Sequence, residues 1–263
     1  IFTVFRILKT VKIPDDVKLG ENVFADCGGL ADENGLFIHD GVAWAYYGDG
    51  DTVRITAGTR VLSKKLFANG FRCNPGNKNI HTVILPDGLE EIGDSAFADC
   101  GLLERITIPE SVQTIGSRAF AGCDHLVRVD MPENVLHMGD GVFIGCRGLA
   151  DEKGFVIANN AIHSFLGEDR EIVVPEGITA IAGGVFNKTG ITSITLPSTL
   201  KKLGSAFTGC NMLTEIEIPE GVTELQRGTF SGCSHLERVS LPSTLIEIDD
   251  SVFEGCEKLV EIS

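Results

Sequence analysis

Basic residues are scarce in this sequence, and long apolar runs are missing. Only 22 Lys and Arg residues stand against 37 Asp and Glu, which gives the 263-residue chain a formal net charge of −15. A surface this acidic repels phosphate backbones and anionic lipids, and no basic patch offsets it, so we expect no nucleic-acid partner. No stretch approaches 18 consecutive apolar residues, so the sequence predicts no transmembrane helix and no direct membrane insertion.

Sequence motifs of catalysis and metal binding are also missing. The GxSxG, HExxH, P-loop and dinucleotide-binding fingerprints do not occur, and no CxxC pair supports structural zinc. The Gly-Asp-Gly-Asp stretch at 48–51 lacks the spaced carboxylates and closing Glu of a calcium loop. His125 and His235 share one repeat position, which favours a polar corner over a metal site. We therefore predict that the protein is not an enzyme and uses no metal or cofactor.

Aromatic residues other than phenylalanine are few, with one Trp and two Tyr against 15 Phe. Many of the phenylalanines belong to a cassette of the form Ala/Val/Thr-Phe-x-Gly/Asp-Cys. It recurs mostly every 23 residues, around Phe97, Phe120, Phe143, Phe207, Phe230 and Phe253. A second beat of apolar residue plus proline falls at Pro86, Pro109, Pro132, Pro197, Pro219 and Pro242. A fixed period of this length predicts stacked supersecondary units, none of which buries its apolar face alone.

One complete unit spans residues 93–115. Ile106 and Ile108 alternate with polar residues, as in a strand with one buried face, and Pro109 ends that strand. Gly116 permits the bend into the next unit. The Asp-Ser pair before Ala96 fits a helix N-cap, so we predict a single helical turn there.

Stacking nine such units aligns three internal rows. One row holds Leu103, Leu126, Leu213, Leu236 and Leu259, and a second holds Ile106, Val129, Ile194, Ile216 and Val239. The third is the phenylalanine row: Phe24, Phe67, Phe97, Phe120, Phe143, Phe186, Phe207, Phe230 and Phe253. We predict one repeat solenoid domain over 1–263, α/β in class but dominated by strands, wound as a right-handed superhelix of about nine coils with short helical turns.

The repeat resembles the BspA-like leucine-rich repeats, the 23-residue type of bacterial surface proteins. The pattern Gly-x-x-Ala-Phe-x-Gly-Cys-x-x-Leu-x-x-Ile-x-Ile-Pro covers essentially the whole chain. Departures are local, since Thr189 replaces one cysteine and Cys73 is out of phase within a 30-residue unit.

The resemblance implies a non-catalytic binding module, displayed on the cell surface or secreted, that recognises an extracellular protein or glycan in adhesion. A structural stalk carrying another domain is the alternative. Both ends of the sequence fall inside repeats, without polar caps and without a signal peptide, so we expect a segment of a longer polypeptide.

Two units carry a duplicated insertion. Residues 31–67 and 150–186 align without gaps, and we predict β-hairpins near 31–52 and 150–171. Asp40-Gly41 and Asn159-Asn160 suit the positive φ of type I′ turns. The only Trp and both Tyr residues lie in the first hairpin. Insertions in a solenoid often form its binding face, and Tyr and Trp are typical of such faces. The second copy is less aromatic yet keeps its apolar pattern, which favours the alternative that these rings pack beneath a widened sheet.

The candidate partner-binding residues are the hairpin aromatics and the outward arginines: Trp44, Tyr46, Tyr47, Arg105, Arg128 and Arg238. Strand alternation places Trp44 and Tyr46 on one face and Tyr47 on the other. Because Phe165 of the second copy matches Tyr46, we expect Trp44 and Tyr46 to pack inward and Tyr47 to be exposed. The arginines lie in outward rows of mixed charge that also contain Ile84 and Val173.

Seven of the eight cysteines fall three residues after a row phenylalanine: Cys27, Cys100, Cys123, Cys146, Cys210, Cys233 and Cys256. At one position of successive coils the side-chain vectors are parallel, whereas a disulfide needs Cβ atoms that face each other. We therefore expect buried free thiols that behave as small apolar groups. Cys73 is the one candidate for a reactive or paired thiol.

Overall fold

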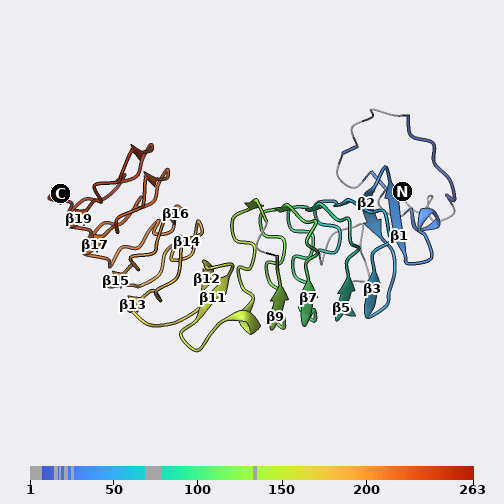
Figure 1. Cartoon of the computed structure of the whole chain (residues 1–263), viewed down its shortest axis with the longest axis horizontal. Coiled ribbons are helices and arrows are strands. Elements are labelled where there is room, and N and C mark those ends of the chain that lie inside the picture. Colours follow the sequence, from blue (N-terminus) through green and yellow to red (C-terminus); the bar gives the residue numbers. More distant parts are fainter. Residues whose placement is uncertain are drawn as a thin grey trace. The chain divides into compact units, whose positions relative to one another are not determined.

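The computed structural model describes residues 8–14, 17, 19–20, 23–24, 27–68, 79–132 and 135–263 (Figure 1). They fall into two compact units, Ile1–Leu149 and Ala150–Ser263, and each is described by itself. Both units consist of short parallel strands joined by turns, with one antiparallel hairpin in each. Cys73 lies outside the described residues.

The first unit is built around two sheets. The six-stranded sheet contains, in spatial order, β1 (Leu36–His39), β2 (Val42–Tyr46), β4 (Val61–Leu62), β6 (Glu91–Ile92), β8 (Thr114–Ile115) and β10 (His137–Met138). The four-stranded sheet contains β3 (Thr52–Arg54), β5 (Thr82–Ile84), β7 (Arg105–Thr107) and β9 (Arg128–Asp130). In β7, Ile106 is buried between exposed Arg105 and Thr107, which confirms the predicted alternation.

The second unit repeats this arrangement. A four-stranded sheet contains β11 (Phe155–Ala158), β12 (Ala161–Phe165), β14 (Ala180–Ile181) and β16 (Lys202–Leu203). The remaining strands are β13 (Glu171–Val173), β15 (Ser193–Thr195), β17 (Glu215–Glu217), β18 (Glu224–Leu225), β19 (Arg238–Ser240), β20 (Glu247–Ile248) and β21 (Glu261–Ile262). The repeat solenoid with two inserted hairpins is thus present as predicted.

The predicted helical turn before each row phenylalanine is wrong. Ser95 and Arg118 have φ values of 54° and 57°, which a right-handed helix does not allow. The N–H groups of Ser95, Phe97 and Asp99 instead donate to carbonyl groups of the following coil, over N···O distances of 2.7–2.9 Å. The N–H groups between them bond three residues back within their own coil. The segment is therefore a run of β-turns that is hydrogen-bonded to the following coil. Among the described residues, the helical segments are the 3₁₀ turns η1 (Gly28–Leu30) and η3 (Arg147–Leu149).

The phenylalanine row packs ring on ring. In the first unit the Phe67–Phe97, Phe97–Phe120 and Phe120–Phe143 centroids are 5.0, 5.1 and 5.6 Å apart, with interplanar angles of 14° or less. In the second unit the stack Phe186–Phe207–Phe230–Phe253 has spacings of 5.4–5.8 Å. Each hairpin adds one tilted ring before its stack, Tyr46 against Phe67 and Phe165 against Phe186. Phe24 packs on Phe37 of the hairpin instead.

Gly116 is required by close packing between coils. The φ of Gly116 is not positive, so its backbone conformation does not require glycine. A Cβ there, however, would lie 2.5 Å from the backbone nitrogen of Asp94 in the preceding coil. Real Cβ atoms essentially never approach so closely, so the glycine sets the coil spacing and does more than ease a bend.

None of the seven row cysteines, all of them among the described residues, forms a disulfide, as predicted. They do more than fill space, because six of them place Sγ 3.0–3.4 Å from the carbonyl oxygen of the phenylalanine in the preceding coil. Such S–H···O contacts are weak, but they recur along both units. Burial raises the pKa of Cys100 and of Cys233 to about 12, so these thiols stay protonated and unreactive at neutral pH.

We expect the row thiols to react with a disulfide reagent only when the chain unfolds. Titration without reductant in denaturant should find seven or eight free sulfhydryls, whereas the native protein should react at Cys73 at most within minutes. Cys256, which is only half-buried, is the internal comparison and should be the first of the row to react. Three or more disulfides would contradict the parallel stacking of the row.

Candidate binding site

Clustered metal ligands and a membrane-spanning helix are both absent from the described part of the chain. It contains no group of three or more His, Cys, Asp or Glu side chains placed to hold a metal ion. Among the same residues, no helix combines the length and the apolar character needed to cross a bilayer. The inserted hairpins are the irregular part of the surface that the repeats form.

Both hairpins are shaped by the same local contacts. Asp32 Oδ1 accepts the N–H groups of Asn34 and Leu36, each at 2.9 Å, and Asp151 repeats this pattern in the second copy. Asp40 and Gly41 have φ values of 48° and 71°, and Asn159 and Asn160 have 47° and 55°. Positive φ at both central residues is what a type I′ turn requires, so the predicted turns are confirmed.

A β-bulge in each hairpin overturns the predicted alternation. Phe37 pairs with Ala45 but Ile38 pairs with Ala43, so Trp44 is an extra residue without a partner in β1. The shift brings both Ala43 and Tyr46 into the core, with exposed fractions of 0% and 2%. Tyr46 is buried, as predicted, but Trp44 does not share its face and is half-buried.

The prediction that Tyr47 is the exposed aromatic is also wrong. Tyr47 is half-buried, its hydroxyl donates to the carbonyl oxygen of Phe24, and its ring lies beside Gly28. It packs on a small cluster formed by Phe24, Cys27, Phe37 and Ala45. Tyr47 therefore anchors the residues preceding the hairpin and is poorly placed to meet a partner.

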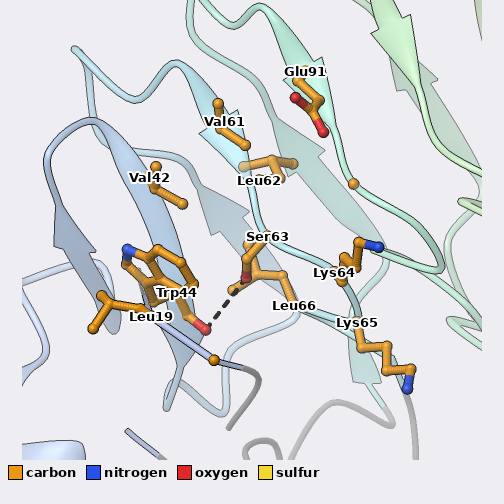
Figure 2. Close-up of a pocket in the computed structure, with 12 residues that line it drawn as sticks. Leu19, Val42, Trp44, Val61, Leu62, Ser63, Lys64, Lys65, Leu66 and Glu91 are labelled. Atoms are coloured by element: carbon orange, nitrogen blue, oxygen red, sulfur yellow. Dashed lines mark hydrogen bonds between the residues drawn. The ribbon is translucent and has the colours of Figure 1, made fainter. Parts of the chain in front are cut away.

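Trp44 borders a pocket of about 440 Å³ on the six-stranded sheet (Figure 2). The apolar part of its lining comes from β2, β4, the turn after β4 and the segment preceding the hairpin, namely Leu19, Val42, Trp44, Val61, Leu62 and Leu66. The polar part comes from Ser63, Lys64, Lys65 and Glu91. Ser63 Oγ donates to the Trp44 carbonyl at 3.4 Å, which ties the bulge to the turn after β4.

Two lysines follow β4 at the edge of this pocket. Lys64 Nζ lies 2.8 Å from Asp94 Oδ2, and this hydrogen bond holds the pKa of the Asp94 carboxyl below its usual value. Lys65 has a φ of 59°. The indole Nε1 of Trp44 is buried and has no hydrogen-bond acceptor among the described residues.

The second hairpin has no comparable lining. Its residues at the pocket positions are smaller: Ala161 for Val42, His163 for Trp44, Ala180 for Val61, Ala182 for Ser63, Gly183 for Lys64 and Gly184 for Lys65. His163 is buried, with its Nε2 3.3 Å from the Ala158 carbonyl oxygen. The two copies share a framework but differ in the side chains around the bulge.

The predicted binding residues do not form one site. Arg105 and Arg128 are neighbours on β7 and β9, but Trp44 and Tyr46 belong to the other sheet of the first unit. Arg238 lies in the second unit. Arg128 Nε is 2.7 Å from Asp130 Oδ1, and Arg238 is 2.7 Å from Glu215 Oε2, so both cations are paired.

Arg105 borders a second hollow of about 340 Å³ on the four-stranded sheet. Its lining includes Thr82, Ile84, Asp87 and Thr107. Sequence reasoning selected Arg105 and Trp44 but missed Val61, Lys64 and Glu91, because the pocket joins residues from successive coils. A position-by-position comparison of the two hairpin copies could have found Val61 and Lys64, whereas Glu91 lies outside the duplicated segment.

The fold defines a leucine-rich-repeat solenoid. The profile of the BspA type leucine-rich repeat region matches six copies over residues 71–160 and 156–263, and the chain belongs to this family. No curated protein matches the chain.

Three solved structures illustrate the likeness. A leucine-rich cell surface protein from Faecalibacterium prausnitzii is 20% identical, with 84% of this chain and 89% of that chain covered and a TM-score of 0.38. A leucine-rich repeat protein from T. pallidum is 25% identical, with 84% and 83% covered and a TM-score of 0.37. The pneumococcal vaccine antigen PcpA is 21% identical, with 84% and 65% covered and a TM-score of 0.45.

We expect His163 to make the second unit sensitive to mild acid. Burial lowers its pKa to about 4, below its value of about 6.5 in an unfolded chain. Between pH 6.5 and pH 4, His163 is therefore protonated in the unfolded chain but neutral in the folded protein. The free energy of unfolding consequently falls as the pH drops from 6.5 to 4. The slope is about 1.4 kcal/mol per pH unit, or about 3 kcal/mol in total.

Urea unfolding of the second unit at several pH values measures this effect. His163→Gln keeps an N–H near the Ala158 carbonyl but cannot titrate, so its stability should depend less on pH than that of the wild type. His235→Gln, at an exposed position in the same unit, is the matched control and should leave the slope unchanged. Equal slopes for His163→Gln and the wild type would show that His163 is not the responsible group.

Proposed function

We propose that the protein is a non-catalytic recognition module of the cell surface or exterior, and that the pocket beside Trp44 is its binding site. The observation that carries this proposal is the difference between the two hairpins. Positions that shape the hairpin are kept, including the Asp32 and Asp151 caps and the paired bulges. Six positions that line the pocket differ between the copies, namely Val42, Trp44, Val61, Ser63, Lys64 and Lys65, whereas Leu62 and Leu66 stay aliphatic as Ile181 and Val185.

A purely structural role does not require this difference. The second hairpin builds the same bulge and sends Phe165 into the ring row with Ala and Gly at the pocket positions. Trp44, Lys64 and Lys65 are therefore not needed to fold the hairpin. Trp is typical of residues that dominate the binding energy of an interface, and the aliphatic lining beside it can exclude water.

Membership of the BspA-type family supports the placement of this module outside the cell, in contact with extracellular proteins or glycans. The stalk hypothesis gives no reason for the different side chains at the equivalent positions of the two hairpins. The two hypotheses differ in one measurable respect, namely whether changing the pocket changes binding.

A binding screen of the purified chain against extracellular-matrix proteins and a glycan array tests the proposal. Trp44→His, which installs the residue of the second hairpin, should weaken any specific ligand by about tenfold or more, because a central interface Trp contributes about 2 kcal/mol or more. Val173→His introduces the same residue at a 62% exposed site in the second unit and should have no effect.

Arg105→Ala and Arg128→Ala separate the alternative surface from the pocket. If these variants lose binding while Trp44→His does not, the contact surface is the four-stranded sheet and the proposal is wrong. If none of the variants changes binding to any ligand, the stalk hypothesis is favoured.

A further inference from the structure

We infer that a second copy of this chain is a partner, held by contact between oppositely charged strand faces of the two molecules. The basic face is the outward side of the four-stranded sheet in the first unit, and the acidic face is the outward side of the equivalent strands in the second unit. In the contact, Glu171 of one copy meets Arg105 of the other, and Val173 enters the hollow beside Arg105. The inference does not use the Trp44 pocket, so it is independent of the proposed function.

The two faces carry opposite charges at equivalent strand positions. The basic face has three arginines against one aspartate. Its outward residues are Thr52, Arg54, Thr82, Ile84, Arg105, Thr107, Arg128 and Asp130. The acidic face has four glutamates against one arginine. Its outward residues are Glu171, Val173, Ser193, Thr195, Glu215, Glu217, Arg238, Ser240 and Glu261. Complementary charges of this kind select partners and orient them.

The charges of the basic face are not balanced within it. Arg105 pairs with Arg128 across the ladder of β7 and β9, and like charges side by side destabilise a sheet. Arg128 turns to Asp130, whereas Arg54 and Arg105 form no ion pair within the described part of the chain. On the acidic face, Glu171 likewise forms none with another described residue. Folding gives no reason for these unpaired charges, and a complementary face gives one.

The hollow beside Arg105 opens because the ladder between β5 and β7 is incomplete. The register pairs Thr82 with Arg105 and no later residues of these two strands. The N–H group of Ile108, which follows β7, donates to the next coil at 2.8 Å, but Leu85, which follows β5, makes no such bond to β7. Leu85 is half-buried, whereas Ile108 is buried. Ile84 and Leu85 therefore offer an apolar surface to a side chain from outside.

The acidic face has a side chain that suits this hollow. Val173 is 62% exposed, and Glu171 lies two residues before it on the same face of β13. A rise of about 3.3 Å per residue separates the two by about 7 Å. Ile84 and Arg105 lie on adjacent strands, two residues out of register, which at a strand spacing of about 4.8 Å is about 8 Å. The apolar and charged groups of the two faces therefore match in spacing. Asp87, in the turn beyond Ile84, repels Glu171 from the other end of the hollow.

The faces are smaller than those of a stable dimer. Each has fewer than ten outward residues, against about 20–30 a side in a stable interface, so we expect a weak association. At about 0.15 M salt the Debye length is about 8 Å, so the net charge of −15 on each copy repels weakly and the facing charges decide the contact. Because the two faces differ, each contact leaves one face of either copy free, and open chains or closed rings form.

Sedimentation velocity of the full chain from about 5 to about 500 μM tests the inference, a range that detects dissociation constants of about a millimolar or tighter. The average mass should rise with concentration at about 0.15 M salt and should rise less at about 1 M, where the Debye length is about 3 Å. Arg105→Glu and Glu171→Arg should each weaken the association by about tenfold or more, because each reversal brings like charges into contact. Both residues are exposed, so each variant should melt at the wild-type temperature.

An equimolar mixture of these two variants is the decisive sample. The reversed basic face of one variant and the reversed acidic face of the other are again complementary, so the mixture should form pairs that neither variant forms alone. Arg227→Glu and Glu152→Arg make the same changes in charge at exposed positions outside both faces. These two controls should associate like the wild type.

Three results would overturn the inference. The first is a wild-type chain that stays monomeric over the whole range. The second is association that survives both reversals, as contact through the exposed Ile246 and Val260 would. The third is a mixture of the two variants that fails to pair. A monomeric chain that binds dextran sulfate and loses this binding in Arg105→Glu would assign the basic face to an anionic polysaccharide instead. None of these results bears on the effect of Trp44→His.

Discussion

Contact between successive coils is the interaction on which the rest of this structure depends. Each coil receives N–H groups from its neighbour, a phenylalanine ring about 5–6 Å from the next ring, and a thiol aimed at a phenylalanine carbonyl. A single coil contains only two short strands and buries little by itself, so its shape exists only within the stack. The pocket inherits this dependence, because its walls come from β2, β4 and β6, which belong to three successive layers of one sheet.

The two bulged hairpins share a backbone but differ in the side chains around the bulge. In both copies the bulge sends one aromatic ring, Tyr46 or Phe165, to join the phenylalanine row. The extra residue at the bulge, Trp44 or His163, has no partner in the opposite strand and does not follow the alternation of inward and outward side chains. One copy uses this freedom for a pocket and the other for a buried histidine. The same backbone thus supports two chemistries, because the ring row carries the structural requirement.

Much of the fold is predictable from the sequence, because the positions that recur in each repeat identify the rows of buried side chains. The Ile106 strand, the free cysteines and the Asp40-Gly41 turn follow from period, alternation and turn chemistry. The turn before Phe97 is not predictable in the same way, because Asp-Ser resembles a helix N-cap and nothing in the sequence indicates the positive φ of Ser95. The bulge at Trp44 inserts a single residue into a hairpin whose apolar pattern reads equally well without it. The pocket unites Leu19 with Glu91, which are separated in sequence and meet only through stacking.

Hydrogen exchange resolved along the chain, applied to Phe120→Ala, tests the dependence on neighbouring coils most directly. Phe120 is fully buried between Phe97 and Phe143, and its truncation should destabilise the first unit by about 3–5 kcal/mol. Val127→Ala, at a 54% exposed position seven residues further on, is the control. Protection against exchange should fall in the coils of Phe97, Phe120 and Phe143, while residues 230–263 keep theirs. Uniform loss of protection from one end of the chain to the other would contradict this dependence on neighbouring coils.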